Sequence, residues 1–358
     1  MGKYSEFISE KRRSIETPEK LVDDNGQVVF GTFDKEFKTL NLLDAKKPTM
    51  LPNFTNKLKL TLWEASEIHL KEGLLLVAVS DMSFFGITKA VFFDYRTRKT
   101  YTWDNTLPSK KTIIAPNLID GSISEGVTKN SHVKFTNNFE IGEAKVEGFS
   151  KSDVDIIEFN LSLKKLSDPS IVSIPFGDNR PLYSEKMFFK VRGFVEFNGE
   201  RFESDDDTLA IIDDHKGYYP RRAHYDWLTA MGKDENGNYM AFNLTRNQSI
   251  NQEDHNENII WFGGKTSLLP PVTFTKDKDV KYTRDGEHQI VHIKDEHGMV
   301  DITYEVEAIS AMITHALLVN IDYYITFGKI KGYILDEDGN KYILDDFEGV
   351  GEDKTLLL

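Results

Sequence analysis

Turn-forming dipeptides divide this chain into short segments, and they constrain its fold more than any other feature. Asn-Gly or Asp-Gly stands at 25–26, 120–121, 198–199, 236–237, 285–286 and 338–339. Each pair supplies the positive φ angles that tight hairpins need. The segment "VDITYEV" at 300–306 alternates apolar and polar side chains, as a strand with one wet face does. We therefore predict an all-β chain of antiparallel barrels or sandwiches.

Helical patterns are few in this sequence. The segment "SEFISEKRRSIE" at 5–16 predicts one short helix, and "EAISAMITHALL" at 307–318 fits either a helix or an extended strand. No glycine-rich phosphate-binding motif follows a strand, so a nucleotide-binding fold is not expected.

The length of 358 residues exceeds what one core usually holds, so we expect two domains. The stretch "LKKLSDPSIVSIPFGDNRP" at 163–181 contains three prolines, a Gly-Asp-Asn turn cluster and little periodicity. We place the boundary there. It gives an N-terminal barrel-like domain at 1–168 and a C-terminal one at 169–358.

The net charge of −14 argues against nucleic acid as a partner and disfavours anionic membrane surfaces. The absence of cysteine excludes disulfides, thiolate nucleophiles and cysteine-based metal sites. The first residues lack the apolar core of a signal peptide, and no apolar run approaches the ~18 residues of a membrane helix. We expect a soluble cytoplasmic protein without stable membrane insertion.

The stretch "HKGYYPRRAHYDWLTAMG" at 215–232 concentrates polar and aromatic chemistry in one place. On a strand, Arg222, His224 and Asp226 share one face, so Asp226 can fix the tautomer of a His that acts as acid or base. We predict His224, Asp226 and Arg222 as catalytic, with His215 as a second acid–base candidate beside Asp213 or Asp214.

A hairpin at 236–237 with an even-numbered loop would add three polar residues to the face of His224, whereas an odd-numbered loop would reverse the pairing. The three residues are Asn243, Thr245 and Asn247.

Further polar and aromatic residues have the composition of a pocket for a polyfunctional small molecule. The predicted ligand-binding residues are Tyr218, Tyr219, Arg221, Trp227, Arg246, Asn247, Gln248, Asn256, Glu257, Asn258 and Trp261. Plainer interpretations stay open. His224 and Asp226 fit a buried structural pair, the segment 256–258 fits a polar loop with Asx turns, and both tryptophans fit the core.

At these residues the sequence resembles the uncharacterised bacterial DUF2804 family. The resemblance rests on "DHKGYYPRRAHYDWLTAMG", "FNLTRNQS" and "NENIIW", and it extends over most of the chain. That family is distantly similar to carotenoid 1,2-hydratase and AttH-type lipocalin-like proteins. The resemblance implies two consecutive lipocalin-like β-barrel domains, and it assigns no catalytic residue.

Three functional hypotheses remain. The first is a lipocalin-like enzyme that performs acid–base chemistry, of hydratase, dehydratase, isomerase or cyclase type, on a small and partly apolar molecule. The second is a non-catalytic barrel that binds an apolar or aromatic ligand. Neither needs a cofactor. The third, a minor one, is a metal-dependent oxygenase that uses His224 and Asp226 with His255, His288 or His292.

Overall fold

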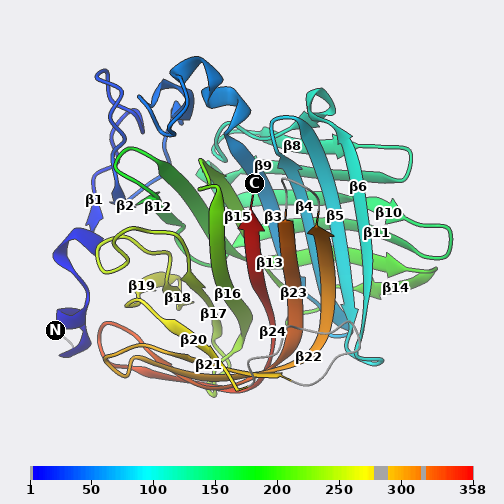
Figure 1. Cartoon of the computed structure of the whole chain (residues 1–358). Coiled ribbons are helices and arrows are strands. Elements are labelled where there is room, and N and C mark those ends of the chain that lie inside the picture. The colour runs from blue at the N-terminus through cyan, green and yellow to red at the C-terminus, as the bar shows by residue number, and fades with distance from the viewer. Residues whose placement is uncertain (1–2, 278–288, 316–319, 358) are drawn as a thin grey trace. The chain divides into compact units, whose positions relative to one another are not determined.

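The computed structural model describes residues 3–277, 289–315 and 320–357, so the turn predicted at 285–286 lies outside the described residues. The chain forms two compact units. The fifteen-stranded unit comprises residues 14–97 and 101–219, and the nine-stranded unit comprises residues 1–13, 98–100 and 220–358 (Figure 1).

The sheet of the fifteen-stranded unit has the order β6-β5-β4-β3-β15-β13-β11-β10-β9-β8-β7, and β1, β2, β12 and β14 lie off this path. Its long ladders are antiparallel, whereas the short pair β1–β2 is parallel. Its strands are β1 (Ser14–Ile15), β2 (Gly31–Phe33), β3 (Thr61–His69), β4 (Gly73–Asp81), β5 (Phe85–Asp94), β6 (Lys99–Pro108), β7 (Thr112–Ile113), β8 (Ser122–Val127), β9 (Ser131–Asn138), β10 (Glu143–Lys151), β11 (Ile156–Lys165), β12 (Ser170–Pro175), β13 (Pro181–Phe197), β14 (Glu200–Glu203) and β15 (Leu209–Gly217).

The sheet of the nine-stranded unit is antiparallel and has the order β19-β18-β17-β16-β24-β23-β22-β21-β20. Lys276 on the edge strand β20 forms an ion pair with Asp353 on the central strand β24, so the sheet curls back on itself. Its strands are β16 (Arg222–Lys233), β17 (Tyr239–Arg246), β18 (Ile259–Phe262), β19 (Lys265–Leu268), β20 (Thr273–Lys276), β21 (Gln289–Lys294), β22 (Val300–His315), β23 (Asn320–Leu335) and β24 (Lys341–Leu357).

All helices among the described residues are short 3-10 turns: η1 (Lys3–Phe7), η2 (Glu10–Arg12), η3 (Leu42–Asp44), η4 (Asn53–Leu58), η5 (Ser109–Lys111) and η6 (Phe139–Ile141). The helix predicted at 5–16 is reduced to η1 and η2. Residues 307–315 belong to β22, so their extended alternative is the observed one. The all-β prediction, with two barrel-like antiparallel sheets, is confirmed. None of these helices is long and apolar enough to cross a membrane.

The compact units change at residues 219 and 220. The boundary predicted at 168/169 lies between β11 and β12, and both strands pair with β13 in one sheet. The nine-stranded unit is also discontinuous, because it includes the first thirteen residues of the chain.

Each unit has its own apolar core. Val77, Phe92, Leu161 and Phe189 lie in the core of the fifteen-stranded unit. The core of the nine-stranded unit includes Leu228 and Ala230 of β16 together with Phe242 and Leu244 of β17. Even-numbered side chains of these two neighbouring strands therefore face inward.

The hairpin of β16 and β17 corrects the predicted register. Its loop, 234–238, has five residues, because the Asp234 carboxylate accepts hydrogen bonds from the backbone N–H groups of Asn236 and Asn238. The expectation of an even-numbered loop was wrong. Since an odd-numbered loop reverses the pairing, the predicted polar set Asn243, Thr245 and Asn247 shares the face of Trp227, and His224 lies on the other face.

Candidate acid–base site

Strand register builds a polar cluster at one end of β16. Asp226 lies opposite Arg246 of β17 on one side and opposite Asp353 of β24 on the other. In the next row His224 lies opposite Thr355. The face that carries His224 and Asp226 continues into the core residues Leu228 and Ala230, so the cluster occupies the polar end of an inward face.

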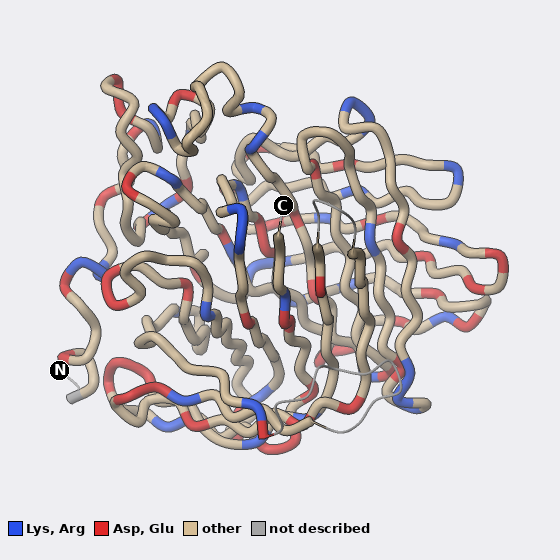
Figure 2. Tube along the Cα trace, in the orientation of Figure 1, with Lys and Arg blue, Asp and Glu red and all other residues tan. Residues whose placement is uncertain are grey.

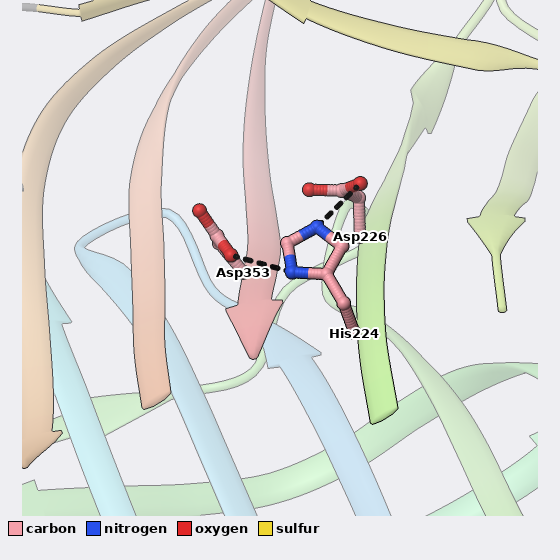
Figure 3. Close-up of side chains that lie close together, drawn as sticks. All are labelled: His224, Asp226 and Asp353. Carbon is pink, nitrogen blue, oxygen red and sulfur yellow. Dashed lines mark ion pairs between the residues drawn. The ribbon is translucent and has the colours of Figure 1, made fainter. Parts of the chain in front are cut away.

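The imidazole of His224 lies between two carboxylates (Figure 3). Its Nε2 is 3.3 Å from Asp226 Oδ2, and its Nδ1 is 3.8 Å from Asp353 Oδ1 and 2.9 Å from the Thr355 hydroxyl. The side chain of His224 is 41% exposed, so a small molecule can reach it, whereas Asp226 is only 5% exposed.

Each carboxylate of the cluster has a cation. Arg246 donates to Asp226 through Nε, at 2.9 Å, and through a second guanidinium nitrogen, and Lys276 pairs with Asp353. Burial by itself would raise the pKa of Asp226. The hydrogen bond with His224 and the charge of Arg246 outweigh burial, so the pKa of Asp226 lies below its usual value.

Several predicted residues adjoin this cluster with changed roles. The cation that neutralises Asp226 is Arg246 rather than Arg222, which is exposed at the start of β16. Arg221 is exposed just before the strand. The side-chain amide of Gln248 donates to the backbone carbonyl of His224 and so holds the strand at that point.

Other predicted ligand-binding residues form hydrogen bonds inside the sheet. Trp227 is buried on the face opposite His224 and donates from Nε1 to Asn243 Oδ1 at 2.7 Å. Asn247 donates to Glu257 Oε1 at 2.7 Å. Trp261 is fully buried in β18.

The amides at 256–258 connect the start of the chain to the sheet. Arg12, only 1% exposed, donates to Asn256 Oδ1 at 3.2 Å and to the Asn258 carbonyl at 3.0 Å. Asn258 also accepts the backbone N–H of Thr245 and donates to the carbonyl of Pro270. Burial lowers the pKa of Arg12 to about 10. This geometry favours the structural interpretation of the segment.

The remaining predicted residues lie in the fifteen-stranded unit. His215 Nε2 is 3.1 Å from Asp213 Oδ1 and 2.9 Å from Lys186 Nζ. The ring of Trp63 packs against His215, with centroids 4.8 Å apart, and stacks on Tyr219 at 5.4 Å. Tyr218 is buried, and its hydroxyl donates to the Leu42 carbonyl. His215, Asp213 and Lys186 thus form a second polar cluster of the acid–base type.

A third polar cluster lies on the other face of β15, and the sequence alone did not point to it. Glu64, Asp214 and Glu185 are cross-strand neighbours on β3, β15 and β13, and all three are fully buried. Lys216 pairs with Asp214. Tyr183 donates to Glu185 at 2.7 Å.

Burial raises the pKa of all three carboxyl groups, to about 8 for Glu185, to about 7 for Glu64, and upward for Asp214. Glu185 therefore holds its proton at neutral pH, and Glu64 is close to the midpoint of its titration there. We call Glu64, Asp214, Glu185 and Lys216 the buried carboxyl cluster.

The arrangement departs from the two-His, one-carboxylate set that the oxygenase hypothesis needs. Among the described residues, the group spaced as metal ligands consists of His224, Asp226 and Asp353, with one His only. His292 contacts Thr303, and His288 lies outside the described residues. Arg246 and Lys276 already neutralise the two carboxylates, which weakens the attraction for a cation.

Asp353, Thr355 and Lys276 belong to this candidate site and were not predicted from the sequence. They occupy β24 and β20, more than fifty positions from His224 along the chain. Their local sequence has no distinguishing motif. Only the pairing of β16 with β24, and the curl that brings β20 over them, assigns them to the site.

Comparisons with known proteins agree with this architecture. The crystal structure of an AttH-like protein from Nitrosomonas europaea matches with a TM-score of 0.50 and 11% identity, over 83% of this chain and 93% of that chain. Kievitone hydratase from Nectria haematococca matches with a TM-score of 0.47 and 11% identity, over 83% and 88%. At 11% identity, the similarity to the AttH-like protein shows a shared fold and nothing about activity. No curated protein matches the chain.

The sequence profile of the family described as a domain of unknown function, DUF2804, matches residues 12–356. The match includes every residue of the three polar clusters. The chain belongs to the DUF2804 family.

Proposed function

We propose that this protein is an acid–base enzyme that acts on a small, partly apolar molecule, with His224 as the residue that transfers the proton. The observation that carries the proposal is the Asp226–His224 pair, 3.3 Å apart, on an inward face whose His remains 41% exposed. A carboxylate behind a reachable imidazole is what general acid–base catalysis requires.

The roles follow from the contacts of the ring. Asp226 accepts a hydrogen bond from Nε2–H and leaves Nδ1 as the basic nitrogen. In the resting protein the Thr355 hydroxyl donates to Nδ1. A substrate that approaches Nδ1 takes the place of this contact. When His224 is protonated, Asp353 on the same side stabilises the imidazolium.

The proposed reactions are those that need only a proton donor and acceptor. They are hydration and dehydration of a carbon–carbon double bond, isomerisation and cyclisation. Arg246 holds Asp226 in its ionised form and acts as a positioning residue. The cluster of His215, Asp213 and Lys186 is the second candidate site for the same chemistry.

Proton transfer to or from carbon is detectable without a known substrate. The purified protein would be incubated in D2O with a mixture of small enones, unsaturated carboxylic acids and β-hydroxy ketones, and products that gain deuterium or water would be identified by mass spectrometry. We expect the His224→Gln variant to lower the rate of such a product by about 10²- to 10⁴-fold.

His315→Gln is the matched control, because His315 is another exposed His paired with a carboxylate, Asp322, in the same unit. If His224→Gln and the wild type give equal rates, His224 is not the acid–base residue, and His215→Gln tests the second cluster. If no compound exchanges but one binds, the protein is the non-catalytic binding barrel.

A further inference from the structure

Three segments that are distant in sequence meet at one end of the fifteen-stranded sheet. They are η4 before β3, the turn between β4 and β5, and η5 after β6. The Ser83 hydroxyl lies 2.8 Å from the Lys57 carbonyl and 2.6 Å from the Leu60 carbonyl, which joins the turn to η4. Ser109 donates to Asp81 at 2.9 Å, which joins η5 to the end of β4.

Large apolar side chains at this end point into solvent. Phe54 of η4 is 87% exposed and Phe84 of the turn is 69% exposed. The other exposed apolar residues in these segments, or within three positions of them along the chain, are Met50, Leu51, Leu58, Phe85 and Ile113. Single exposed apolar residues are ordinary, but a group of this size marks an interaction surface.

The stretches that form this end are positively charged, whereas the chain as a whole is negative; the acidic residues beside them include Asp81, which accepts from Ser109, and Glu125, which lies opposite Ile113. The stretches 45–63, 82–93 and 105–119 contain lysines but no Asp or Glu, although the chain carries a net charge of −14. Elsewhere acidic residues are spread along both sheets (Figure 2). The exposed lysines that flank the apolar residues are Lys46, Lys47, Lys57, Lys59, Lys110 and Lys111. We call these apolar and lysine residues together the Lys–Phe end.

We propose that the Lys–Phe end binds the surface of an anionic lipid bilayer. Exposed aromatic side chains enter the interface between headgroups and acyl chains, and lysines around them attract anionic headgroups. The net negative charge of the chain disfavours an anionic bilayer. Salt limits electrostatic interactions to about 10 Å, however, so the lysines next to the bilayer determine whether this end is attracted to it. The inference is independent of the acid–base proposal, because it uses none of its residues.

The test uses the full chain and vesicle flotation. Vesicles of phosphatidylcholine alone are compared with vesicles that also contain about 30 mol% phosphatidylserine, at low salt and at about 0.5 M NaCl. We expect binding to the anionic vesicles at low salt, at least about tenfold weaker binding to the neutral ones, and loss of binding at high salt.

Two double variants separate the apolar from the electrostatic contribution. Phe54→Ser with Phe84→Ser, and Lys57→Glu with Lys110→Glu, should each lower binding at least about tenfold. The matched controls are Val154→Ser with Ile250→Ser, at exposed apolar positions elsewhere, and Lys71→Glu with Lys265→Glu, at exposed lysines elsewhere. Both control proteins should bind as the wild type does. A circular dichroism melt verifies that every variant is folded.

Absence of binding to anionic vesicles overturns the proposal, and so does binding that both Lys–Phe variants retain. Self-association that depends on Phe54 and Phe84, without vesicle binding, also overturns it and assigns the surface to a second copy of the chain. A Phe54→Trp variant adds a direct readout, since its fluorescence should shift to the blue only with anionic vesicles.

Discussion

The two units solve the problem of buried carboxylates in opposite ways. At the proposed acid–base site of the nine-stranded unit, Asp226 and Asp353 each have a cation, and the pKa of Asp226 is lowered. In the buried carboxyl cluster of the fifteen-stranded unit, Glu64, Asp214 and Glu185 share Lys216, and their pKa values are raised.

The same residue types therefore hold charge in one place, whereas in the other burial favours the protonated forms of Glu64 and Glu185 beside the Lys216–Asp214 ion pair. Solvent access and the number of nearby cations decide whether such a carboxyl group is ionised or protonated, because an unpaired charge in a dry interior is costly. The comparison teaches that an Asp or Glu on an inward face is not by itself a sign of a catalytic carboxylate.

The largest effect should come from the loss of the cation in the buried carboxyl cluster. Lys216→Met leaves Asp214 without its ion-pair partner among two further carboxyl groups. Removal of one partner of a buried pair typically costs about 3–5 kcal/mol. Urea unfolding at neutral pH measures this loss of unfolding free energy. Lys265→Met, at an exposed position, is the control and should change little. A loss as small as that of the control would contradict the buried pairing.

Glu185→Gln should remove a pH dependence of stability. The pKa of Glu185 rises from the usual 4.5 to about 8 in the folded protein, so the folded state holds the proton more tightly than the unfolded state. Its contribution to stability is therefore greatest at low pH and declines as the pH rises from about 4.5 to 8. At pH 8.5 the unfolding free energy of the variant should exceed that of the wild type by roughly 2–4 kcal/mol. At pH 4 the two proteins should be almost equally stable.

Unfolding curves of both proteins across this pH range provide the measurement. Glu158→Gln, an exposed glutamate on β11, is the matched control and should leave the pH profile unchanged. A wild-type profile without any decline between pH 5 and 8 would show that Glu185 is ionised in the folded protein.

Asp226→Asn should change the stability less than Glu185→Gln does, and it should destabilise the protein rather than stabilise it. Because the pKa of Asp226 is lowered on folding, its stabilising effect is present above the usual pKa of 3.8 and is lost as the pH falls through its lower value in the folded protein. We expect a loss of about 1–2 kcal/mol at pH 7 and almost none at pH 2. Denaturant unfolding at the two pH values tests this, and an equal loss at both would contradict an ionic role.

Arg246→Gln should have the smallest effect, because the side chain of Arg246 is 42% exposed and solvent weakens its ion pair. The expected loss of stability is below about 1 kcal/mol. The pKa of Asp226 should nevertheless rise, which carbon NMR of the labelled carboxylate can follow. An unchanged titration would show that the hydrogen bond with His224 alone keeps the pKa low.

The architecture was largely predictable from the sequence, because hairpin turns and period-two alternation are local signals. The alternation in 300–306 corresponds to β22, and the face shared by His224 and Asp226 follows directly from that rule. The loop between β16 and β17 was not predictable to the residue. Its length depends on hydrogen bonds that Asp234 makes to the turn, and one residue of difference moves Asn243 and Thr245 to the other face.

The partners of His224 could not be predicted for a different reason. Asp353 and Thr355 meet it through pairing between strands that are far apart in the chain, and local sequence contains no information on that register. The stretch that begins at His215 illustrates the same limit. His215 and His224 are nine positions apart, yet they belong to different sheets.

The docking of Arg12 has a consequence for the order of events during synthesis. Its partners Asn256 and Asn258 follow 244 and 246 residues later. At a ribosomal rate of about 5–20 residues per second, Arg12 is synthesised roughly 12 to 50 seconds before its acceptors exist. The first segment of the chain must therefore remain unattached while the whole fifteen-stranded unit is made. The nine-stranded unit can be completed only after the fifteen-stranded unit has been made, and its completion requires a segment that precedes that unit in the nascent chain.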